Sequence, residues 1–448
     1  MSKRGLISLF ALAVLAVHGA YTAKIDLDRP DGIYKSGDTA VCTVLVCKDG
    51  KPLVGETVRV LQRWEGRIVR TEKFVADGRP VTISCKSDKP GWVYFGAEVL
   101  DGNGNPRKYV GVRRWRKPTI IGEIGALFSP DKILSRVREP ADFDEFWAKR
   151  RAEVDAGDKP ATLTEIDSGT AGIKLFAVTI PCPRGVTATG YLAYPEKAAP
   201  KSLPGYVAFQ GLTYADANRA SAVDRAKKGM LAFVTTWHGF PLGKPKKYYG
   251  KELRAYYQYG QKGLGDREKW VYTDIFFRVM SELRFLKERP EWDGRTLVVH
   301  GISLGGILSA FAAAIEPAVT TAVIGVPSFC ECNAHEAGRT PYSVYRRGGI
   351  KRLQEHPELL EAGFYYDAVN FARRLKCRTF VCTGFVDESC YPSNVFAFYN
   401  AIPATTERSM TTDPRTGHID TTKAPEVAAR IEALIGTPSV GRRPDEAH

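Results

Sequence analysis

The sequence predicts two domains: a small β-sandwich, then an α/β domain with a mostly parallel sheet and helices on both faces. Residues 24–118 contain short β-branched or aromatic runs separated by Gly, Asp and Asn turns, as in all-β domains. From about residue 170, short apolar runs alternate with helical patterns, which is typical of a parallel sheet. With 448 residues, 44% of them hydrophobic, the chain is long enough for both cores.

Residues 1–23 have the pattern of a signal peptide. Lys3 and Arg4 precede an apolar run over residues 6–17, and small residues follow at 19–23. The run is too short to span a bilayer, and no later segment reaches eighteen consecutive apolar residues. We therefore expect a secreted or periplasmic protein without a membrane span.

The predicted sandwich contains strand-like runs at 40–46, 57–61, 81–84 and 92–95. Core packing is the favoured interpretation of its aromatic residues, and a sugar-binding face is the alternative; these residues are Trp64, Trp92, Tyr94 and Trp115. Cys42 and Cys85 lie in strand-like segments, so either a disulfide bridge or buried free thiols fit the pattern.

Charge and cysteine spacing exclude some functions. The net charge is +14, but the 64 basic residues are spread among 50 acidic ones, and the densest basic cluster, residues 113–117, is short. This distribution favours a solvated domain edge over a nucleic-acid surface. The nine cysteines show no Cys-x-x-Cys spacing, which argues against a zinc site. We expect no nucleic-acid partner and no metal.

A linker is predicted at 119–140, followed by the α/β domain at 141–436 and a flexible tail at 437–448. A helix begins near residues 142–147, with acidic residues in its first turn. Residues 176–180 and 188–194 are expected to form an antiparallel pair. Buried strands are expected at 206–209, 231–234, 297–299, 322–324 and 379–382. The clearest helix, at 273–287, has its apolar residues on one face.

The segment from 297 to 306 is the most informative part of the chain. An apolar run leads into Gly301-Ile302-Ser303-Leu304-Gly305, and small residues follow. A strand, a sharp turn with one serine and a helix form a nucleophile elbow, in which the glycines avoid clashes with the strained serine backbone. A tight turn with a solvated serine is the alternative.

A nucleophilic serine needs a histidine base and an acid that orients the histidine. In the α/β-hydrolase fold the chain order is serine, acid, histidine. His418, before the last helix, is the histidine that fits this order. Asp387 follows the strand at 379–382 and is the expected acid. The remaining histidines lie before Ser303, before the acid or at a terminus; they are His18, His238, His300, His335, His356 and His448. A turn aspartate and a loop histidine are the alternatives for Asp387 and His418.

Two backbone N–H groups are expected to stabilise the negative charge that develops on the reacting carbonyl. One belongs to Leu304, which follows the nucleophile at a helix N-terminus. The other is expected in the loop after the strand at 206–209, from Leu212, with Tyr214 as its rival.

With these residues in place, the chain from about 125 to 436 resembles the acetyl xylan esterase/cephalosporin C deacetylase family of carbohydrate esterases. Three segments carry the resemblance: Ala-Asp-Phe-Asp-Glu-Phe-Trp at 141–147, Phe-Leu-Lys-Glu-Arg-Pro-Glu-Trp-Asp at 285–293, and 387–396, which is similar to the family's Asp-x-x-Cys-x-Pro-x-x-x-Phe. The resemblance implies a Ser303–His418–Asp387 triad that removes acetyl groups from sugar hydroxyls without a metal or other cofactor.

The chain departs from the family pattern at three points. It has Gln210-Gly211 instead of His-Gly, His238-Gly239-Phe240 instead of Arg-Gly-Gln, and His300-Gly301-Ile302-Ser303-Leu304 where the family has Gly-Gly-Ser-Gln. Backbone donors survive such changes, whereas pocket side chains do not. The candidate pocket residues are Gln210, Tyr214, Trp237, His238 and Tyr391. The sequence is compatible with a homo-oligomer. The N-terminal strands would obstruct the ring-like oligomers that are typical of shorter members of the family.

The resulting hypothesis is an exported serine carboxylesterase that deacetylates xylan or xylo-oligosaccharides through an acyl-enzyme. One alternative keeps the fold but acts on another ester or a peptide. The other is a catalytically inactive glycan-binding protein.

Overall fold

The structure is a computed structural model that describes residues 21–108 and 119–437. Most of the predicted signal peptide, the basic cluster at 113–117 with Trp115, and nearly all of the predicted tail lie outside the described residues. Within the described ranges, no helix combines the length and the apolar character needed to cross a membrane.

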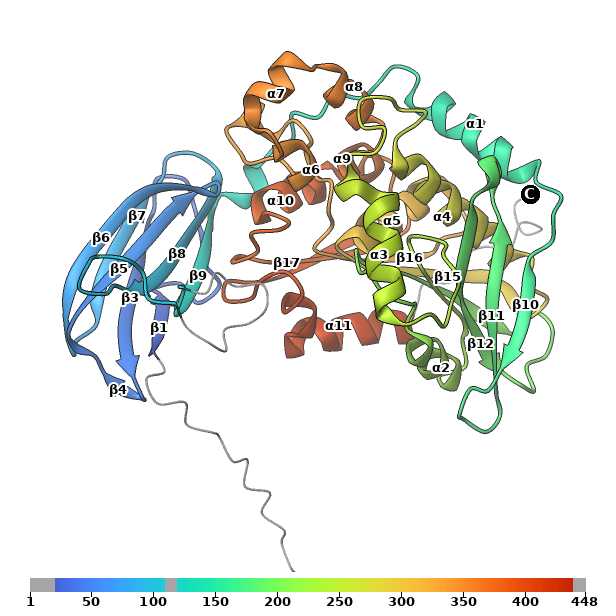
Figure 1. The fold of residues 1–448 in the computed structure, drawn as a ribbon, viewed down its shortest axis with the longest axis horizontal. Helices are drawn as coiled ribbons and strands as arrows, with labels where there is room; N and C mark the ends of the chain where they lie inside the picture. The colour runs from blue at the N-terminus through green and yellow to red at the C-terminus, as the bar shows by residue number, and fades with distance from the viewer. Residues whose placement is uncertain (1–20, 109–118, 438–448) are drawn as a thin grey trace, which may run out of the picture.

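The N-terminal domain is the predicted sandwich of two sheets (Figure 1). One sheet contains β1 (Tyr21–Leu27), β3 (Thr39–Lys48), β4 (Lys51–Pro52) and β7 (Val81–Lys86). The other has the order β2 (Ile33–Tyr34), β9 (Gly122–Phe128), β8 (Gly91–Val99), β5 (Val54–Trp64) and β6 (Arg67–Asp77).

The sandwich extends beyond its predicted boundaries at both ends. β1 begins at Tyr21, inside the predicted signal peptide, and β9 lies inside the predicted linker. β9 pairs with β8 from Gly91↔Phe128 to Ala97↔Gly122. The boundary at residue 118 is therefore corrected: an apolar strand with three small residues was mistaken for a linker because its glycines resemble turn signals.

Burial decides between the alternatives for the sandwich side chains. All nine cysteines are free thiols, and Cys42 and Cys85 are both buried. Trp92 and Tyr94 are fully buried, but in an apolar cluster shared with the second domain and not in the sandwich core, so they do not form a sugar-binding face. Burial also raises the pKa of the Cys42 thiol to about 12, which keeps it neutral.

The second domain contains a nine-stranded sheet, which confirms the α/β-hydrolase fold. Its order is β10 (Thr162–Ile166), β11 (Ile173–Pro181), β12 (Thr187–Pro195), β14 (Leu231–Thr235), β13 (Leu203–Phe209), β15 (Trp292–Ile302), β16 (Thr321–Gly325), β17 (Arg378–Gly384) and β18 (Arg408–Asp413). Strands β10, β11, β12 and β14 pair antiparallel, as predicted for the entry pair β11–β12, and the pairs from β14 to β18 are parallel.

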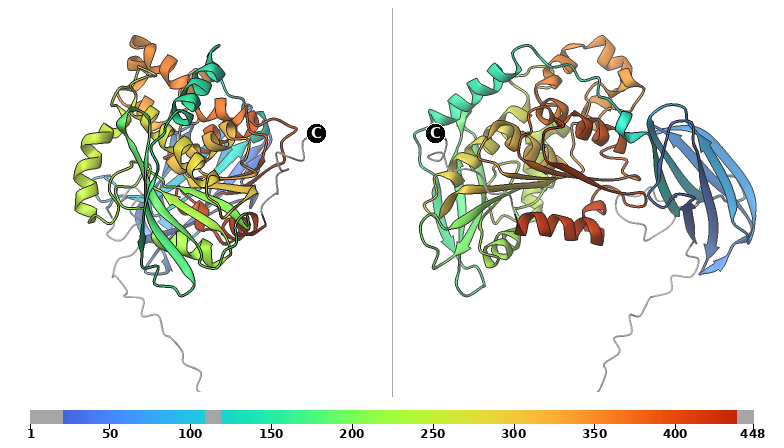
Figure 2. Two further views of the ribbon diagram at one scale, coloured as in Figure 1. Left: turned by 90° about the vertical axis from the view of Figure 1, so that its right-hand side faces the viewer. Right: turned by 180° about the vertical axis from the view of Figure 1, so that it is seen from behind.

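Helices cover both faces of this sheet (Figure 2). The larger core packs against α1 (Phe143–Asp155), α4 (Val271–Lys287), α5 (Leu304–Ile315) and α9 (Ala368–Ala372). The opposite face packs against α2 (Arg219–Lys227) and α11 (Pro425–Gly436). Alternate residues of the central strands supply the two cores; for example, Val298 faces α11, whereas Val299 faces the larger core.

Five further helices lie in the connections: α3 (Lys246–Tyr257), α6 (Ser343–Arg346), α7 (Gly349–Glu355), α8 (Glu358–Phe364) and α10 (Pro392–Ala401). The sandwich lies beside α10 and the red strands that include β17, so the two domains are in contact and not separated by a free linker (Figures 1 and 2).

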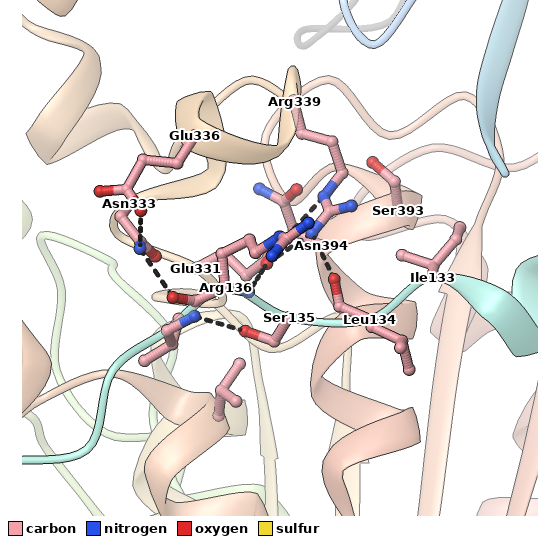
Figure 3. A network of polar contacts seen from close by, with 12 residues as sticks. Ile133, Leu134, Ser135, Arg136, Glu331, Asn333, Glu336, Arg339, Ser393 and Asn394 are labelled. Carbon is pink, nitrogen blue, oxygen red and sulfur yellow. Dashed lines mark hydrogen bonds and ion pairs between the residues drawn. The ribbon is translucent and has the colours of Figure 1, made fainter. Parts of the chain in front are cut away.

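Polar contacts fix the chain segment that leaves the sandwich (Figure 3). Glu331 and Arg339 form a buried ion pair, and Arg339 also donates to the Leu134 carbonyl at 2.9 Å. The Arg136 N–H donates to Glu331 at 3.2 Å, and Asn333 donates to the Arg136 carbonyl at 2.9 Å. The segment around residues 134–136, which connects the two domains, is therefore bound to the loop after β16. It cannot act as a hinge without breaking these bonds.

Candidate active site

Ser303 occupies a strained position between β15 and α5. Its φ of 61° and ψ of −115° are unusual for a residue with a side chain. A Cβ on Gly301 would lie 2.1 Å from the Gly305 carbonyl oxygen, and one on Gly305 would lie 2.1 Å from the Phe209 oxygen. Both glycines are therefore required by close backbone approach, and the predicted strand, turn and helix are present.

Asp387 and His418 form a pair near the C-terminal ends of the parallel strands, the end of the sheet where β15 leads into Ser303. Asp387 follows β17 and is fully buried, and its Oδ2 lies 2.8 Å from His418 Nδ1. Its Oδ1 accepts the N–H groups of Ser389 at 2.7 Å and Cys390 at 3.0 Å. The carboxylate is thus held by three hydrogen bonds, and Nε2 of the imidazole is left to serve a second partner.

Cys390 is a site residue that the sequence interpretation did not single out. Its buried Sγ lies within 4.8 Å of a His418 ring nitrogen and an Asp387 carboxylate oxygen. The Ser303 and His418 side chains both act to lower the pKa of this thiol, which indicates that they are its neighbours. Burial raises the pKa of this thiol, which keeps it neutral. The Asp-x-x-Cys spacing could have indicated this residue. The loop after Asp387 turns back, so that the N–H of Cys390, three residues later, donates to the Asp387 carboxylate.

Asp387, Cys390 and His418 are also the only described group of three potential metal ligands, with donor atoms within 4.8 Å of one another. Asp387 Oδ2 and His418 Nδ1 already bond to each other. This arrangement matches an oriented imidazole better than a set of metal ligands.

The electrostatics of His418 favour its protonated form. Burial alone would lower the pKa of the imidazole, but the adjacent Asp387 carboxylate outweighs burial and raises this pKa above its ordinary value. The imidazole must be neutral to accept a proton, so the pair is suited to alkaline conditions.

The loop after β13 approaches the elbow closely. A Cβ on Gly211 would lie 3.0 Å from the Ile302 carbonyl oxygen, so Leu212 follows a residue that packs directly on the end of β15. Gln210 folds the loop back by donating to the Asp216 carbonyl at 2.7 Å. Leu304 is the first residue of α5. The structure thus brings the segments with both expected N–H donors to the elbow.

Three of the candidate pocket residues support this loop. The Trp237 indole N–H donates to the Thr213 carbonyl at 2.8 Å, and Tyr214 packs edge-on against Trp237 with 6.4 Å between ring centroids. His238 is fully buried; its Nε2 lies 3.1 Å from the Ala215 carbonyl, and its Nδ1 accepts the Phe240 N–H at 3.0 Å. Burial lowers the pKa of His238 to about 4, so this histidine is neutral and structural.

Tyr391 lies on the other side of the site. It packs against Trp92 of the sandwich, with ring centroids 5.3 Å apart. With Cys390, Phe329 and Tyr342 it lines a cavity of about 10 Å³, which is room for about one water molecule.

The other described histidines have separate roles. His300 is half-buried in the central strand β15, with its Nδ1 2.9 Å from the Tyr206 hydroxyl, and desolvation lowers its pKa to about 4. His356 is exposed and pairs with Glu358 at 3.0 Å. His335 is half-buried in the loop after β16, and burial lowers its pKa. His18 and His448 lie outside the described residues.

Comparisons with known proteins agree with this geometry. The family model described as acetyl xylan esterase (AXE1) matches residues 131–427. Acetyl esterase Axe7A of Xylanibacter ruminicola is 26% identical over 396 residues, which cover 86% of this chain and 84% of that protein. That alignment is long enough to include part of the sandwich as well as the α/β domain.

Two solved structures share the fold of the second domain. The acetyl xylan esterase from Paenibacillus sp. R4 superposes with a TM-score of 0.58 at 21% identity, covering 68% of this chain and 97% of that one. Acetyl xylan esterase 1 from Thermoanaerobacterium sp. JW/SL YS485 gives a TM-score of 0.56 at 21% identity, with 69% and 98% coverage. Nearly all of each solved structure is matched, but only about two thirds of this chain is. The two solved structures therefore have no counterpart of the whole N-terminal sandwich.

Proposed function

The chain belongs to the acetyl xylan esterase family and is a carboxylic ester hydrolase, and from that premise we propose that it removes acetyl groups from acetylated glycans through a Ser303–His418–Asp387 triad. The observation that carries the proposal is the 2.8 Å bond between buried Asp387 and His418, at the sheet edge that also holds the strained Ser303. The Cys390 Sγ, within 4.8 Å of donor atoms of Asp387 and His418, and the effect of Ser303 on the pKa of this thiol support the closeness of the three groups.

In the proposed mechanism, Ser303 Oγ attacks the acetyl carbonyl carbon while His418 Nε2 accepts the hydroxyl proton. Asp387 stabilises the imidazolium that results. The N–H groups of Leu304 and Leu212 donate to the oxyanion, where one such donor typically contributes about 3 kcal/mol to lowering the barrier. The bond from the acyl carbon to the sugar oxygen then breaks, His418 gives its proton to that oxygen, and the acetyl group remains on Ser303 as an acetyl-enzyme.

The second half of the reaction repeats these steps with water. His418 accepts a proton from water, which attacks the acetyl carbonyl, and Ser303 leaves with that proton as acetate is released.

The proposal predicts that Ser303→Ala abolishes ester cleavage, with a loss on the order of a millionfold in kcat. Ser309→Ala is the matched control. Ser309 lies in α5, which begins directly after Ser303, and its hydroxyl donates to the Gly305 carbonyl at 2.9 Å. The loss of this hydroxyl should leave kcat nearly unchanged. A fluorophosphonate probe should label Ser303, as shown by peptide mapping. Labelling elsewhere, or full activity of Ser303→Ala, would contradict the triad. A wild-type protein that cleaves no ester would favour the glycan-binding role.

A panel of p-nitrophenyl esters tests the acyl group. We expect acetate to be released much faster than butyrate or longer acids, while a preference for long acids would favour the alternative esterase function. Acetylated xylo-oligosaccharides test the glycan directly.

Export is part of the proposal and rests on Lys3, Arg4 and the apolar run that follows. N-terminal sequencing of the mature protein from the producing cell tests it. Retention of Met1 would contradict export.

A further inference from the structure

Strand β9 of the sandwich packs on the two loops that carry Asp387 and His418. The Gly125 N–H donates to the Pro414 carbonyl at 2.9 Å, four residues before His418. A Cβ on Gly125 would lie only 2.0 Å from the Phe385 carbonyl oxygen, two residues before Asp387. One sandwich residue thus contacts both loops at a distance that only glycine permits.

The sandwich contacts residues on both sides of Asp387. The Trp92 indole N–H donates to the Phe385 carbonyl at 2.7 Å, and both groups are fully buried. The same ring packs on Tyr391, and Arg63 of β5 forms an ion pair with Glu388, which is next to Asp387. Residues 385–391, here named the acid loop, are therefore bound to the sandwich before and after the carboxylate.

The acid loop is in turn bound to the loop that leads to His418. The Phe385 N–H donates to the Asp413 carbonyl at 2.8 Å, and the Val386 N–H donates to the Thr416 carbonyl at 3.2 Å. Arg415 reaches the sandwich, where it donates to the Ile25 carbonyl at 2.6 Å. A displacement of the sandwich surface would therefore move the acid and the histidine relative to the elbow.

An apolar cluster joins the domains at the same place. Its sandwich members are Trp92, Tyr94 and Leu127, and its catalytic-domain members include Phe385, Val386, Tyr391 and Phe396. The acid loop has no helix or strand of its own, so its position depends on what packs against it.

We propose that the N-terminal sandwich is a positioning element of the active site, in which Trp92 and Gly125 hold the acid loop so that the Asp387 carboxylate faces His418. This inference rests on the proposed triad. Trp92 and Gly125 are positioning residues: they touch neither substrate nor the reacting atoms, and they act through the Phe385 backbone.

The test compares two alanine substitutions in the same strand of the full-length protein. Gly125→Ala places a methyl group against the Phe385 carbonyl. Gly122→Ala is the matched control, because its Cβ would lie 2.4 Å from the Ala23 carbonyl, inside the sandwich. Both changes are uncharged, so neither alters the electrostatics of His418 directly.

For Gly125→Ala we expect kcat to fall by about tenfold or more, since catalytic groups are sensitive to small displacements, while KM changes by less than about twofold. The acidic limb of the pH–kcat profile should also move down toward the ordinary histidine value of about 6.5, because a displaced carboxylate raises the pKa of His418 less. Gly122→Ala, measured per folded molecule, should keep the wild-type kcat and limb.

Equal kcat and equal limbs for the two alanine variants would overturn the proposal, and so would a fall in kcat without movement of the limb. If Gly125→Ala does not fold, Trp92→Phe decides by the same two readouts, because it removes the donor to Phe385 but keeps an aromatic ring. Ser303→Ala, run in parallel, separates the two proposals: an active Ser303→Ala refutes the triad, whereas an inactive one beside a normal Gly125→Ala refutes only the positioning role.

Discussion

The buried carboxyl group of Glu65 makes the stability of this protein depend on pH in a calculable way. Glu65 lies in the turn between β5 and β6, only 3% exposed, at the contact between the domains. Its side chain accepts the Trp92 N–H at 2.7 Å and the Ser393 hydroxyl at 2.6 Å. Burial is the largest effect and raises the pKa of Glu65 from 4.5 to about 7, despite these two bonds.

A raised carboxyl pKa means that the folded state binds the proton more tightly than the unfolded state does. The contribution of Glu65 to stability is complete below pH 4.5, where both states are protonated, and is lost as the pH rises to about 7. With these two pKa values, the free energy of unfolding should fall by about 2–3 kcal/mol between pH 5 and pH 8 because of this group alone.

Glu65→Gln tests this calculation, because the amide keeps an acceptor for Trp92 and a partner for Ser393 but does not ionise. Denaturant unfolding, followed by tryptophan fluorescence at pH 5 and pH 8, gives the free energy of unfolding of each variant. The stability of Glu65→Gln relative to wild type should rise by about 2–3 kcal/mol from the lower to the higher pH. Glu145→Gln, on the exposed side of α1, is the control and should show no such change. A difference between Glu65→Gln and wild type that is the same at both pH values would refute the reasoning.

Three further predictions concern the active site. The rate of p-nitrophenyl acetate hydrolysis should rise with pH from 6 through neutrality, because the Asp387 carboxylate holds the pKa of His418 above 6.5 and only the neutral imidazole accepts a proton; a rate independent of pH from 5 to 8 would exclude His418 as the base. Gly305→Ala should abolish most activity and destabilise the protein by about 1–3 kcal/mol, since its methyl group would lie 2.1 Å from the Phe209 carbonyl oxygen; denaturant unfolding and kcat measure this, and an unaltered variant would contradict it. Iodoacetamide should leave Cys390 unmodified in the native protein at pH 8 and alkylate it after unfolding, because burial raises the thiol pKa; mass spectrometry of the native sample would reveal any contrary labelling.

Local patterns predicted most of the architecture. The alternation of apolar runs and helices gave the strands of the α/β domain, and the Gly-x-Ser-x-Gly segment gave the elbow, because these features depend on neighbours within about ten residues. The short helices α6, α7 and α8 were not predicted, since each is too short for a clear periodic pattern. The mistaken linker has a related cause: β9 becomes a strand by pairing with β8, about 30 residues away.

The sequence by itself determined which residues are the candidates for ester hydrolysis, because the order serine, acid, histidine and the glycines around Ser303 are properties of the chain. Only the tertiary structure decided how these residues are held. The approach of Cys390 to His418, the burial of His238 beneath the loop after β13, and the packing of Trp92 and Gly125 on Phe385 join segments as much as about 290 residues apart. No local pattern encodes such contacts, since they depend on how two separately folded cores meet.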